Sequence, residues 1–431
     1  MMTFIKILRC YVVGCLILAC GSCDTAGTIT PPHDYYFMKY YGSDGNQSAV
    51  DLQVLDDGSF LILGNSVFDF STDVILMRVD GVGKLLWQKS LVVGIGVDLE
   101  PVADGSFVVL VNVASGFQLL RITGDGDILD QSPVMSDGGN VIAHSVTPLA
   151  DGGFMVSGQS QATGPGVSDP GNVLNFKVSS TFGRHVAWGP VNHGFGGGGS
   201  GSGESRLDVA IKTFQKLVAR IEGGQEIVDT LYYVFGYSNT NIGNDNPLGQ
   251  QGLFYFERGE LGQSGQVRYA ANPDASNTEI RQVLAVPSTL GSGYVVLGTA
   301  RRSQDENLFL ARLRDPLLFN SSDATLFTNV SLGRQLSAVA VAPSLVGARG
   351  FFLLGNESRA TGSRNIWLTK IDQSGAVQWS ATFGSENEND TAAAVVELPD
   401  GRIVVLGTMA LADNQTKIAL FKINAQGQFL Q

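Results

Sequence analysis

The chain has 431 residues and a net charge of -12, with 54 glycines and 16% charged residues. Its hydrophobic share of 44% is enough for a large core, which excludes a disordered or collagen-like chain. Many glycines and few charges are typical of a turn-rich β protein, and an all-β chain of this length can form one domain. The acidic balance gives no electrostatic footprint for nucleic acid, so we expect neither DNA nor RNA as a partner.

The first 19 residues have the layout of an export signal. Lys6 and Arg9 form a basic start, and residues 11–19 form an apolar run. That run is too short to span a bilayer but has the length of a signal-peptide core. We therefore expect residues 1–19 to be a signal peptide. All four cysteines lie within the first 23 residues, so the body has no thiol for a disulfide, a metal or a nucleophile.

Ile17-Leu18-Ala19-Cys20 resembles the bacterial lipobox, in which apolar and small residues precede a cysteine that receives the lipid. The resemblance implies a palmitate-bearing lipoprotein with its lipid on Cys20 and a tether over residues 20–34. Cys23 is the alternative lipid site, and an ordinary secretory signal is the alternative to both. The expected location is the outer membrane, on its periplasmic side or at the cell surface.

An apolar motif recurs seven times and is closed by glycine in six copies, with Val111 in the second copy. The first copy is Asp57-Gly58-Ser59-Phe60-Leu61-Ile62-Leu63-Gly64. Its aromatic position recurs as Phe107, Phe154, Tyr232, Tyr294 and Phe351, with Ile403 in the last copy. A second strand follows each copy and carries a basic residue in one register: Arg78, Arg121, Lys177, Arg312, Lys370 and Lys422, with Glu257 in the fourth copy. A repeat of this kind predicts a closed array of identical small units.

Each unit is expected to hold four short strands. An apolar stretch such as residues 49–55 precedes the motif, and a strand with a tryptophan follows in three units, at Trp87, Trp188 and Trp379. Seven four-stranded units without a helical period predict an all-β protein, a β-propeller of seven blades that spans residues 35–431 as one domain. Alanines 392–394 suit the crowded axis of such a ring.

The repeat also predicts how the ring closes. The seventh unit lacks a fourth strand, and residues 36–42 align with residues 378–384 of the sixth unit. We therefore expect the N-terminal strand to complete the last blade and to cover its open edge.

These units resemble the seven-bladed propeller repeats of bacterial envelope and surface lipoproteins, which read D-G-G-[FY]-x-x-x-G, then L-x-K-x-D-x-x-G-x-x-x-W, then F-G. The best matches are residues 151–158 and residues 370–384, and the resemblance extends from residue 36 to the C-terminus. It implies a membrane-anchored binding or scaffold module with a monomeric body, and it transfers no catalytic residue.

Candidate catalytic and metal-binding residues are few. The histidines are His33, His144, His185 and His193, with His144 expected in a first strand and His185 in a fourth strand, and none has metal-ligand spacing. Glycines 194–203 satisfy a phosphate-loop pattern without its helix or lysine, so we interpret residues 193–205 as a flexible loop. We expect no cofactor. Calcium bound by Glu386, Glu388 and Asp390 is the alternative, because these residues supply hard oxygen ligands.

Loop lengths predict the binding face. Turns between first and second strands and between third and fourth strands are short, whereas connections between second and third strands, and between blades, are long and dissimilar. We name these sides the tight-turn face and the long-loop face. Long loops on a rigid scaffold usually carry binding residues. The candidates on the long-loop face are Asp44, Asn46, Phe68, Phe70, Asp137, Asn140, Glu386, Glu388 and Asp390.

The expected ligand of that face is a protein or a polar or glycan molecule. The alternative function is an envelope enzyme that uses the propeller channel, either a polysaccharide hydrolase or lyase or a quinone-type oxidoreductase. The tryptophans of the fourth strands are interpreted as packing residues, which leaves Phe68 and Phe70 as the exposed aromatic candidates.

Overall fold

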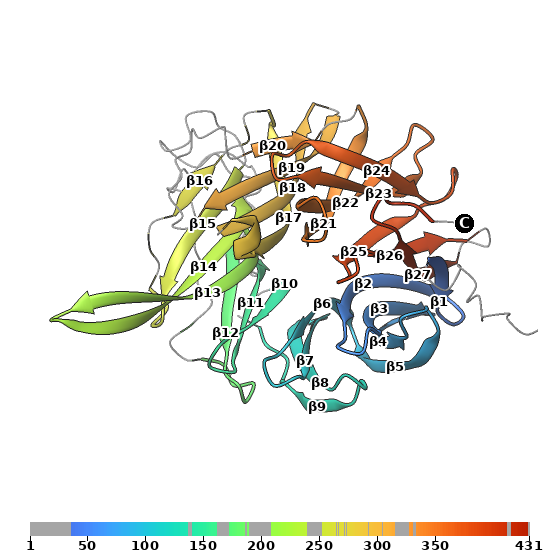
Figure 1. The fold of residues 1–431 in the computed structure, drawn as a ribbon. Helices are drawn as coiled ribbons and strands as arrows, with labels where there is room; N and C mark the ends of the chain where they lie inside the picture. The colour runs from blue at the N-terminus through green and yellow to red at the C-terminus, as the bar shows by residue number, and fades with distance from the viewer. Residues whose placement is uncertain are drawn as a thin grey trace, which may run out of the picture.

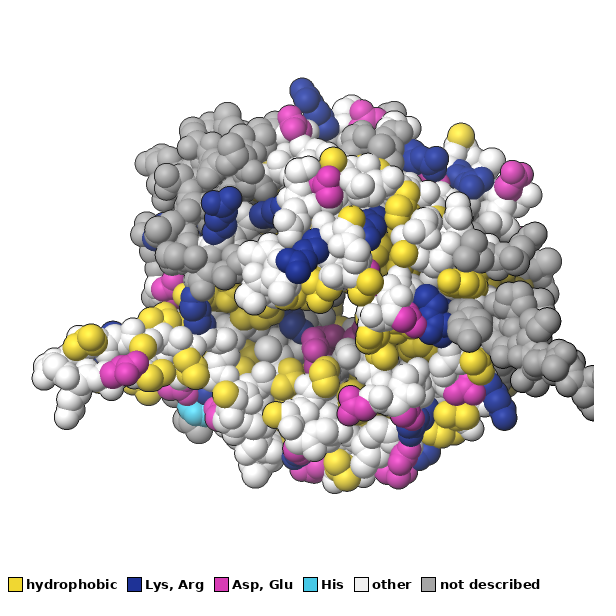
Figure 2. Space-filling model, viewed as in Figure 1, with side chains coloured by type: hydrophobic (Ala, Val, Ile, Leu, Met, Phe, Trp, Pro, Cys, Tyr) yellow, Lys and Arg dark blue, Asp and Glu magenta, His cyan; other side chains and the backbone are white. Residues whose placement is uncertain are grey.

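The computed structural model describes residues 36–136, 140–161, 172–185, 188, 208–238, 252–263, 265, 267–270, 272, 274–291, 293–303, 305–314, 327–330, 333–411 and 415–429. These residues form seven antiparallel sheets arranged as a ring around a central hollow, a seven-bladed β-propeller (Figures 1 and 2). The predicted fold class is confirmed.

Blades 1 to 4 follow one another along the chain. Their strands, in order from the axis outward, are β2 (Asn46–Val54), β3 (Phe60–Phe68), β4 (Ser71–Val79) and β5 (Leu85–Val93); β6 (Ile95–Pro101), β7 (Phe107–Val113), β8 (Gly116–Ile122) and β9 (Ile128–Gln131); β10 (Asn140–Pro148), β11 (Phe154–Gln161) and β12 (Asn172–Val178); and β13 (Asp208–Glu222), β14 (Gln225–Ser238), β15 (Gly252–Gly259) and β16 (Arg268–Ala270). In blade 3 the described residues add one isolated bridge, between Val178 and Arg184. His185 follows that bridge and lies outside any strand, which corrects its expected place in a fourth strand.

Blades 5 to 7 complete the ring. Their strands are β17 (Asn277–Val286), β18 (Gly293–Arg302), β19 (Asp305–Arg314) and β20 (Phe327–Val330); β21 (Gln335–Ser344), β22 (Gly350–Ser358), β23 (Arg364–Asp372) and β24 (Val377–Phe383); and β25 (Thr391–Glu397), β26 (Ile403–Ala410), β27 (Thr416–Ile423) and β1 (Phe37–Tyr41). The 3-10 turn η2 (Ser288–Leu290) connects β17 to β18.

The N-terminal strand closes the ring, as the repeat predicts. Strand β1 pairs antiparallel with β27, with Phe37 opposite Lys422 and Tyr41 opposite Ile418. The Tyr41 hydroxyl donates a 2.8 Å hydrogen bond to the carbonyl oxygen of Gly83 in blade 1. The last blade is therefore covered on its outer edge and joined to its neighbour.

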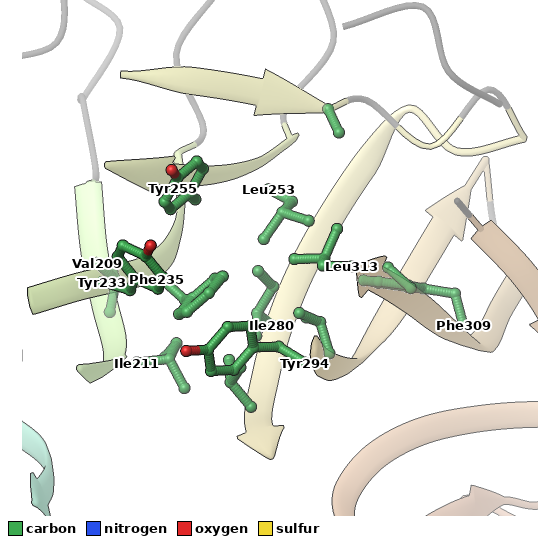
Figure 3. Close-up of a cluster of buried hydrophobic side chains, with 14 of the residues drawn as sticks. Val209, Ile211, Tyr233, Phe235, Leu253, Tyr255, Ile280, Tyr294, Phe309 and Leu313 are labelled. Atoms are coloured by element: carbon green, nitrogen blue, oxygen red, sulfur yellow. The ribbon is translucent and has the colours of Figure 1, made fainter. Parts of the chain in front are cut away.

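Apolar contacts between neighbouring blades form the core. Figure 3 shows the cluster between blades 4 and 5, where the rings of Phe235 and Tyr294 lie with centroids 4.8 Å apart. The two central strands of each blade are buried on both sides, which explains the continuous apolar runs of the sequence. Trp188 is fully buried, whereas Trp87 and Trp379 are half-buried and pack against the turn glycines Gly126 and Gly427 of the next blade.

The repeated basic residue holds the tight-turn face together. Arg78 pairs with Asp57 of its own blade at 2.7 Å and with Asp125 in a turn of the next blade. Lys422 donates a 2.6 Å hydrogen bond to the carbonyl oxygen of Gly81 across the closure. Acidic residues in the turns are therefore structural partners of the basic residue that recurs in the third strands.

All seven first strands carry a β-bulge at the same place. The register shifts between Ala49 and Asp51, Gly96 and Asp98, Ala143 and Ser145, Ala210 and Lys212, Ile280 and Gln282, Ala338 and Ala340, and Ala392 and Ala394. Near these bulges, the side chain of one blade often accepts a hydrogen bond from a backbone N–H of the next. One example is the Thr408 hydroxyl, which accepts from the Ala49 N–H at 2.9 Å and joins blade 7 to blade 1. A bulge leaves a backbone group without a ladder partner, so these side chains satisfy it.

Strands β13 and β14 extend beyond their blade as a two-stranded arm, which the repeat does not predict (Figure 1). The arm turns at Gly223-Gly224 and exposes Leu217, Ile221 and Val228. It leaves the ring on the tight-turn face because it joins a first strand to a second strand.

Candidate functional site

A cavity of about 570 Å³ lies in the central channel. Each of the seven first strands contributes its bulged residue and the residue after it to the wall. The lining continues from the bulges toward the turns that follow the first strands. The cavity therefore occupies the half of the channel beside the tight-turn face. Figure 2 shows the hollow, with acidic and basic side chains visible inside it.

The wall differs from blade to blade. Blades 6 and 7 contribute small apolar side chains, among them Val339, Ala340, Ala393 and Ala394. Blades 1 to 5 contribute the charged and titratable groups Asp51, Asp98, Glu100, His144, Lys212 and Arg281. The charge therefore lies on one side of a channel whose other side is nearly apolar.

Lys212 lies at the centre of the charged side. Its ammonium group pairs with Glu100, lies 3.4 Å from an Asp98 carboxylate oxygen, and donates a 2.7 Å hydrogen bond to the Val146 carbonyl oxygen. Burial alone would lower the pKa of Lys212, but Asp98 and Glu100 outweigh it and raise that pKa above its ordinary value. Lys212 therefore stays charged and links blade 4 to blades 2 and 3.

The carboxylates outnumber the lysine. Burial, followed by repulsion from Asp98 and Glu100, raises the pKa of Asp51 well above its ordinary value. Burial also raises the pKa of Glu100, although Lys212 opposes the shift. Burial is the first cause of both shifts, and both favour the neutral, protonated form of the carboxyl group.

Strand β10 of blade 3 adds two polar atoms without partners. Neither His144 Nε2 nor Thr147 Oγ1 has a hydrogen-bond partner, and both residues line the cavity. Burial, and then the nearby charge of Arg281, lowers the pKa of His144 to about 4, so the ring is neutral at neutral pH. The Arg281 guanidinium itself pairs with Glu279 at 2.6 Å.

Part of the polar wall has a structural explanation. Asp51 accepts a hydrogen bond from the Leu99 N–H at 3.0 Å, and Asp98 accepts one from the Val146 N–H at 2.8 Å. Gln282 accepts from the Val341 N–H at 2.6 Å in the same way. These three side chains join consecutive blades at equivalent positions. No such bond accounts for Glu100, His144 or Arg281.

The predicted rim residues do not line this cavity. Asp44, Asn46, Asn140 and Glu386 are exposed on the long-loop side, where Asn46 accepts a 3.0 Å hydrogen bond from the Thr416 N–H. Asp137 lies outside the described residues. Cys20, Cys23, His33, His193 and residues 193–205 lie outside them as well.

Asp390 is a structural residue of its loop, which corrects its place among the exposed candidates. It is fully buried, and its carboxylate accepts hydrogen bonds from the N–H groups of Ser385 and Ala410 at 2.8 and 2.9 Å. Across the described part of the chain, no three His, Cys, Asp or Glu side chains are grouped so as to hold a metal ion, and this includes Glu386, Glu388 and Asp390.

Phe68 and Phe70 are exposed at the β3–β4 turn, on the long-loop face. Their exposed fractions are 62% and 108%. Val67, Val93 and Ile95, at the same end of blade 1 and the start of blade 2, are also exposed. We name these five residues the blade 1 patch. It is an exposed apolar surface on a rigid scaffold, which is typical of an interaction site.

The sequence did contain a signal for the cavity. The three residues around each bulge read Ala49-Val50-Asp51, Gly96-Val97-Asp98, Ala143-His144-Ser145, Ala210-Ile211-Lys212, Ile280-Arg281-Gln282, Ala338-Val339-Ala340 and Ala392-Ala393-Ala394. An alignment of the first strands would have shown polar residues at positions that are apolar in other copies. The recurring motif that defines the repeat lies in the second and third strands instead.

No helix in the described residues has the length and apolar character needed to cross a membrane. No family model matches the chain, and no curated protein matches it either. Solved structures do match over most of its length. A polysaccharide lyase, Uly1, is 11% identical over 89% of this chain and 91% of its own, with a TM-score of 0.46. Drosophila Plexin A in complex with Semaphorin 1b is 9% identical over 90% and 86%, with a TM-score of 0.44. The C-terminal WD40 domain of Sif2 is 13% identical over 89% and 84%, with a TM-score of 0.39.

Likenesses of this size concern the path of the backbone, and we take no activity from them. The fold and the site define a seven-bladed β-propeller with a charged cavity in its channel and an apolar patch on its long-loop face.

Proposed function

We propose that this chain is an exported, lipid-anchored binding module of the bacterial envelope that binds a protein partner on its long-loop face. The observation that carries the proposal is the blade 1 patch, in which Phe68 and Phe70 are held in water by a short turn. Aromatic side chains that are exposed on a rigid scaffold are typical anchors of protein interfaces.

The contrast between the two faces supports this choice. On the tight-turn face, the acidic turns of the repeat pair with its basic residues, as Asp57 and Asp125 do with Arg78. On the long-loop face, Asp44 and Glu386 are exposed beside loops that differ from blade to blade. Exposed polar residues are usual on the surface around the apolar centre of an interface.

The anchoring part of the proposal depends on the N-terminal sequence. The basic start, the apolar run and the lipobox-like Ile17-Leu18-Ala19-Cys20 support export and lipidation at Cys20, with the outer membrane as the site. Mass spectrometry of the mature N-terminus tests it. We expect a diacylated Cys20, and a Cys20→Ala variant should leave the membrane fraction. A diacylated Cys23 or an unmodified start would contradict this part alone.

A photo-crosslinking amino acid at position 70 tests the binding part. In cells of the native host, we expect it to capture one protein, and we expect Phe68→Ser to abolish the adduct. The matched control places the same crosslinker at Asp400 on the tight-turn face, where no adduct is expected. An equal adduct at both positions, or none at position 70, would overturn the proposed face.

An envelope enzyme is the second candidate, and the raised pKa values of Asp51 and Glu100 in the cavity are the observation that favours it, because perturbed carboxyl groups are typical of acid catalysis. Release of reducing or unsaturated sugar ends from envelope polysaccharide, lost in Glu100→Gln, would support a hydrolase or lyase. If the polysaccharide stayed intact after prolonged incubation, the enzyme would be excluded and the binding module would remain the proposed function.

A further inference from the structure

We propose that a pocket between blades 5 and 6 binds a small organic phosphate, a phosphate monoester carried on an apolar group, through Arg312 and Arg314. The pocket has a volume of about 420 Å³ and lies where β17, β19 and β22 reach the tight-turn face. A pocket of this size can hold a small molecule. It is on the face opposite to the blade 1 patch, so the proposal does not depend on the protein partner proposed there.

The basic residue of the repeat has no acidic partner in the first turn of blade 5. In blade 1, Arg78 pairs with Asp57 in the turn between the first and second strands and with Asp125 of the next blade. Blades 2 and 3 have the same kind of pair within the blade, Arg121 with Asp104 and Lys177 with Asp151. Blade 5 has Arg312 in this register, but the corresponding turn, residues 287–292, contains no acidic residue.

The turn of blade 6 that contacts Arg312 does not supply the missing carboxylate either. Ser374 occupies the place that Asp125 has in blade 2, one residue before the glycine of the turn. The Asp372 carboxylate is held within its own turn, where it accepts hydrogen bonds from the N–H groups of Ser374 and Ala376 at 2.8 and 2.9 Å. Within the described residues, Arg312 donates only to backbone carbonyl oxygens of this turn and pairs with no carboxylate.

The positive charge of Arg312 therefore persists without a counter-ion. A guanidinium group keeps its proton in proteins, so burial cannot neutralise it as it neutralises a carboxyl group. Burial lowers the pKa of Arg312, and the charge of Asp372 offsets this shift only in part. The two carbonyl oxygens take one N–H from each terminal nitrogen of Arg312. Each of these nitrogens has a second N–H, which can bind a ligand oxygen.

A second arginine and apolar side chains complete the pocket. Arg314, the last residue of β19, is exposed and lines the same pocket, and no ion pair between described residues includes it. Guanidinium groups match the oxygens of a phosphate, and a phosphate monoester carries about two negative charges, one for each arginine. Val286 and Leu290 are half-buried in the lining. They can contact the apolar group that carries the phosphate.

Isothermal titration of the full-length protein in detergent, with a protein-free blank, tests the proposal. The probes are phenyl phosphate, benzoate with its single charge, inorganic phosphate without the apolar group, and benzyl alcohol without the charge. At constant ionic strength we expect phenyl phosphate to bind at least fivefold more tightly than each of the others. No binding of phenyl phosphate, or equal binding of benzyl alcohol, would overturn the proposal. Equal binding of benzoate would overturn the choice of phosphate, and equal binding of inorganic phosphate would overturn the apolar part.

Two variants locate the binding. Arg314→Gln should weaken phenyl phosphate at least fivefold, and the matched control Arg302→Gln, at the exposed long-loop end of β18, should leave it unchanged. Ser374→Asp restores the carboxylate that blade 2 has at this position, so it should pair with Arg312 and weaken phenyl phosphate at least tenfold. Its control, Ser374→Asn, has a similar size without the charge and should bind like the wild type.

The outcomes of these variants are separate from those of the protein partner. Unaltered binding of phenyl phosphate in folded Arg314→Gln would overturn the site, and unaltered binding in folded Ser374→Asp would overturn the role of Arg312. Circular dichroism shows whether each variant is folded. Phe68→Ser should not change the binding of phenyl phosphate, because the blade 1 patch lies on the opposite face.

Discussion

His144 should make the propeller sensitive to mild acid. The pKa of this histidine falls from 6.5 to about 4 because the ring is buried and lies near Arg281. The unfolded chain therefore takes up a proton below pH 6.5, whereas the folded chain does so only near pH 4. Stability from a lowered histidine pKa is present above 6.5 and is lost as the pH falls toward 4.

The size of the effect follows from the shift. At about 1.4 kcal/mol per pKa unit, the full loss is about 3 kcal/mol, and about 2 kcal/mol of it is lost between pH 7 and pH 5. His144→Val removes the titrating group. We therefore expect urea denaturation, followed by circular dichroism, to show a smaller loss of stability in His144→Val than in the wild type over this range, by about 2 kcal/mol.

The comparison of the two proteins isolates the histidine. The raised pKa values of Asp51 and Glu100 act in the opposite direction, because those groups favour the folded state as the pH falls. Asp51 and Glu100 are present in the wild type and in His144→Val. Their contributions therefore largely cancel when the losses of stability of the two proteins are compared. Ile211→Val, at the bulge of blade 4, is the control for packing and should shift stability equally at both pH values. Equal losses in His144→Val and the wild type would refute a buried, neutral His144.

Four further predictions test the remaining features. The raised pKa of Asp51 stabilises the fold at low pH, and this contribution is lost as the group ionises above pH 4. The denaturation temperature should therefore fall less with rising pH in Asp51→Asn than in the wild type, and an unchanged pH profile would contradict this. Deletion of residues 36–42 should lower the denaturation temperature and cause concentration-dependent aggregation, measured by light scattering, since β27 loses its partner. Asp57→Ala should lower stability slightly, with a loss that fades below pH 4 because the pKa of Asp57 is about 2 and its contribution is lost as the pH falls toward that value. Phe68→Ser combined with Phe70→Ser should change stability by less than about 1 kcal/mol, since both rings are already in water.

The fold could be predicted because the repeat records contacts that every blade makes in the same way. Trp87 and Trp379 contact equivalent turn glycines of the next blade, Gly126 and Gly427. Arg78 and Lys422 likewise each bind a turn of the next blade. Such positions must keep their residue type for the blades to stack. Ring closure followed from the same logic, because residues 36–42 match the strand that the seventh unit lacks.

The cavity could not be predicted from loop lengths because its residues lie within strands. In first strands, the residues after the bulge face the axis, where the contacts differ from blade to blade, so no shared pattern draws attention to them. Asp390 illustrates the opposite error. A run of acidic residues suggested an exposed cluster, but its carboxylate satisfies two backbone N–H groups of the loop and is buried. The arm formed by β13 and β14 is a local extension that other copies do not share.

The residue that follows the bulge joins neighbouring blades in some first strands and not in others. Asp51, Asp98 and Gln282 each accept a hydrogen bond from the next blade, but at the joint between blades 3 and 4 the direction is reversed, and Ser145 donates to the Ile211 carbonyl oxygen at 2.6 Å. In blade 4 the equivalent residue is Lys212, which reaches back to blades 2 and 3. Blades 6 and 7 have Ala340 and Ala394 at the same position, so the ring closes there without such a bond. The bulge is therefore the feature that every first strand keeps, whereas the side chain that follows it differs between blades.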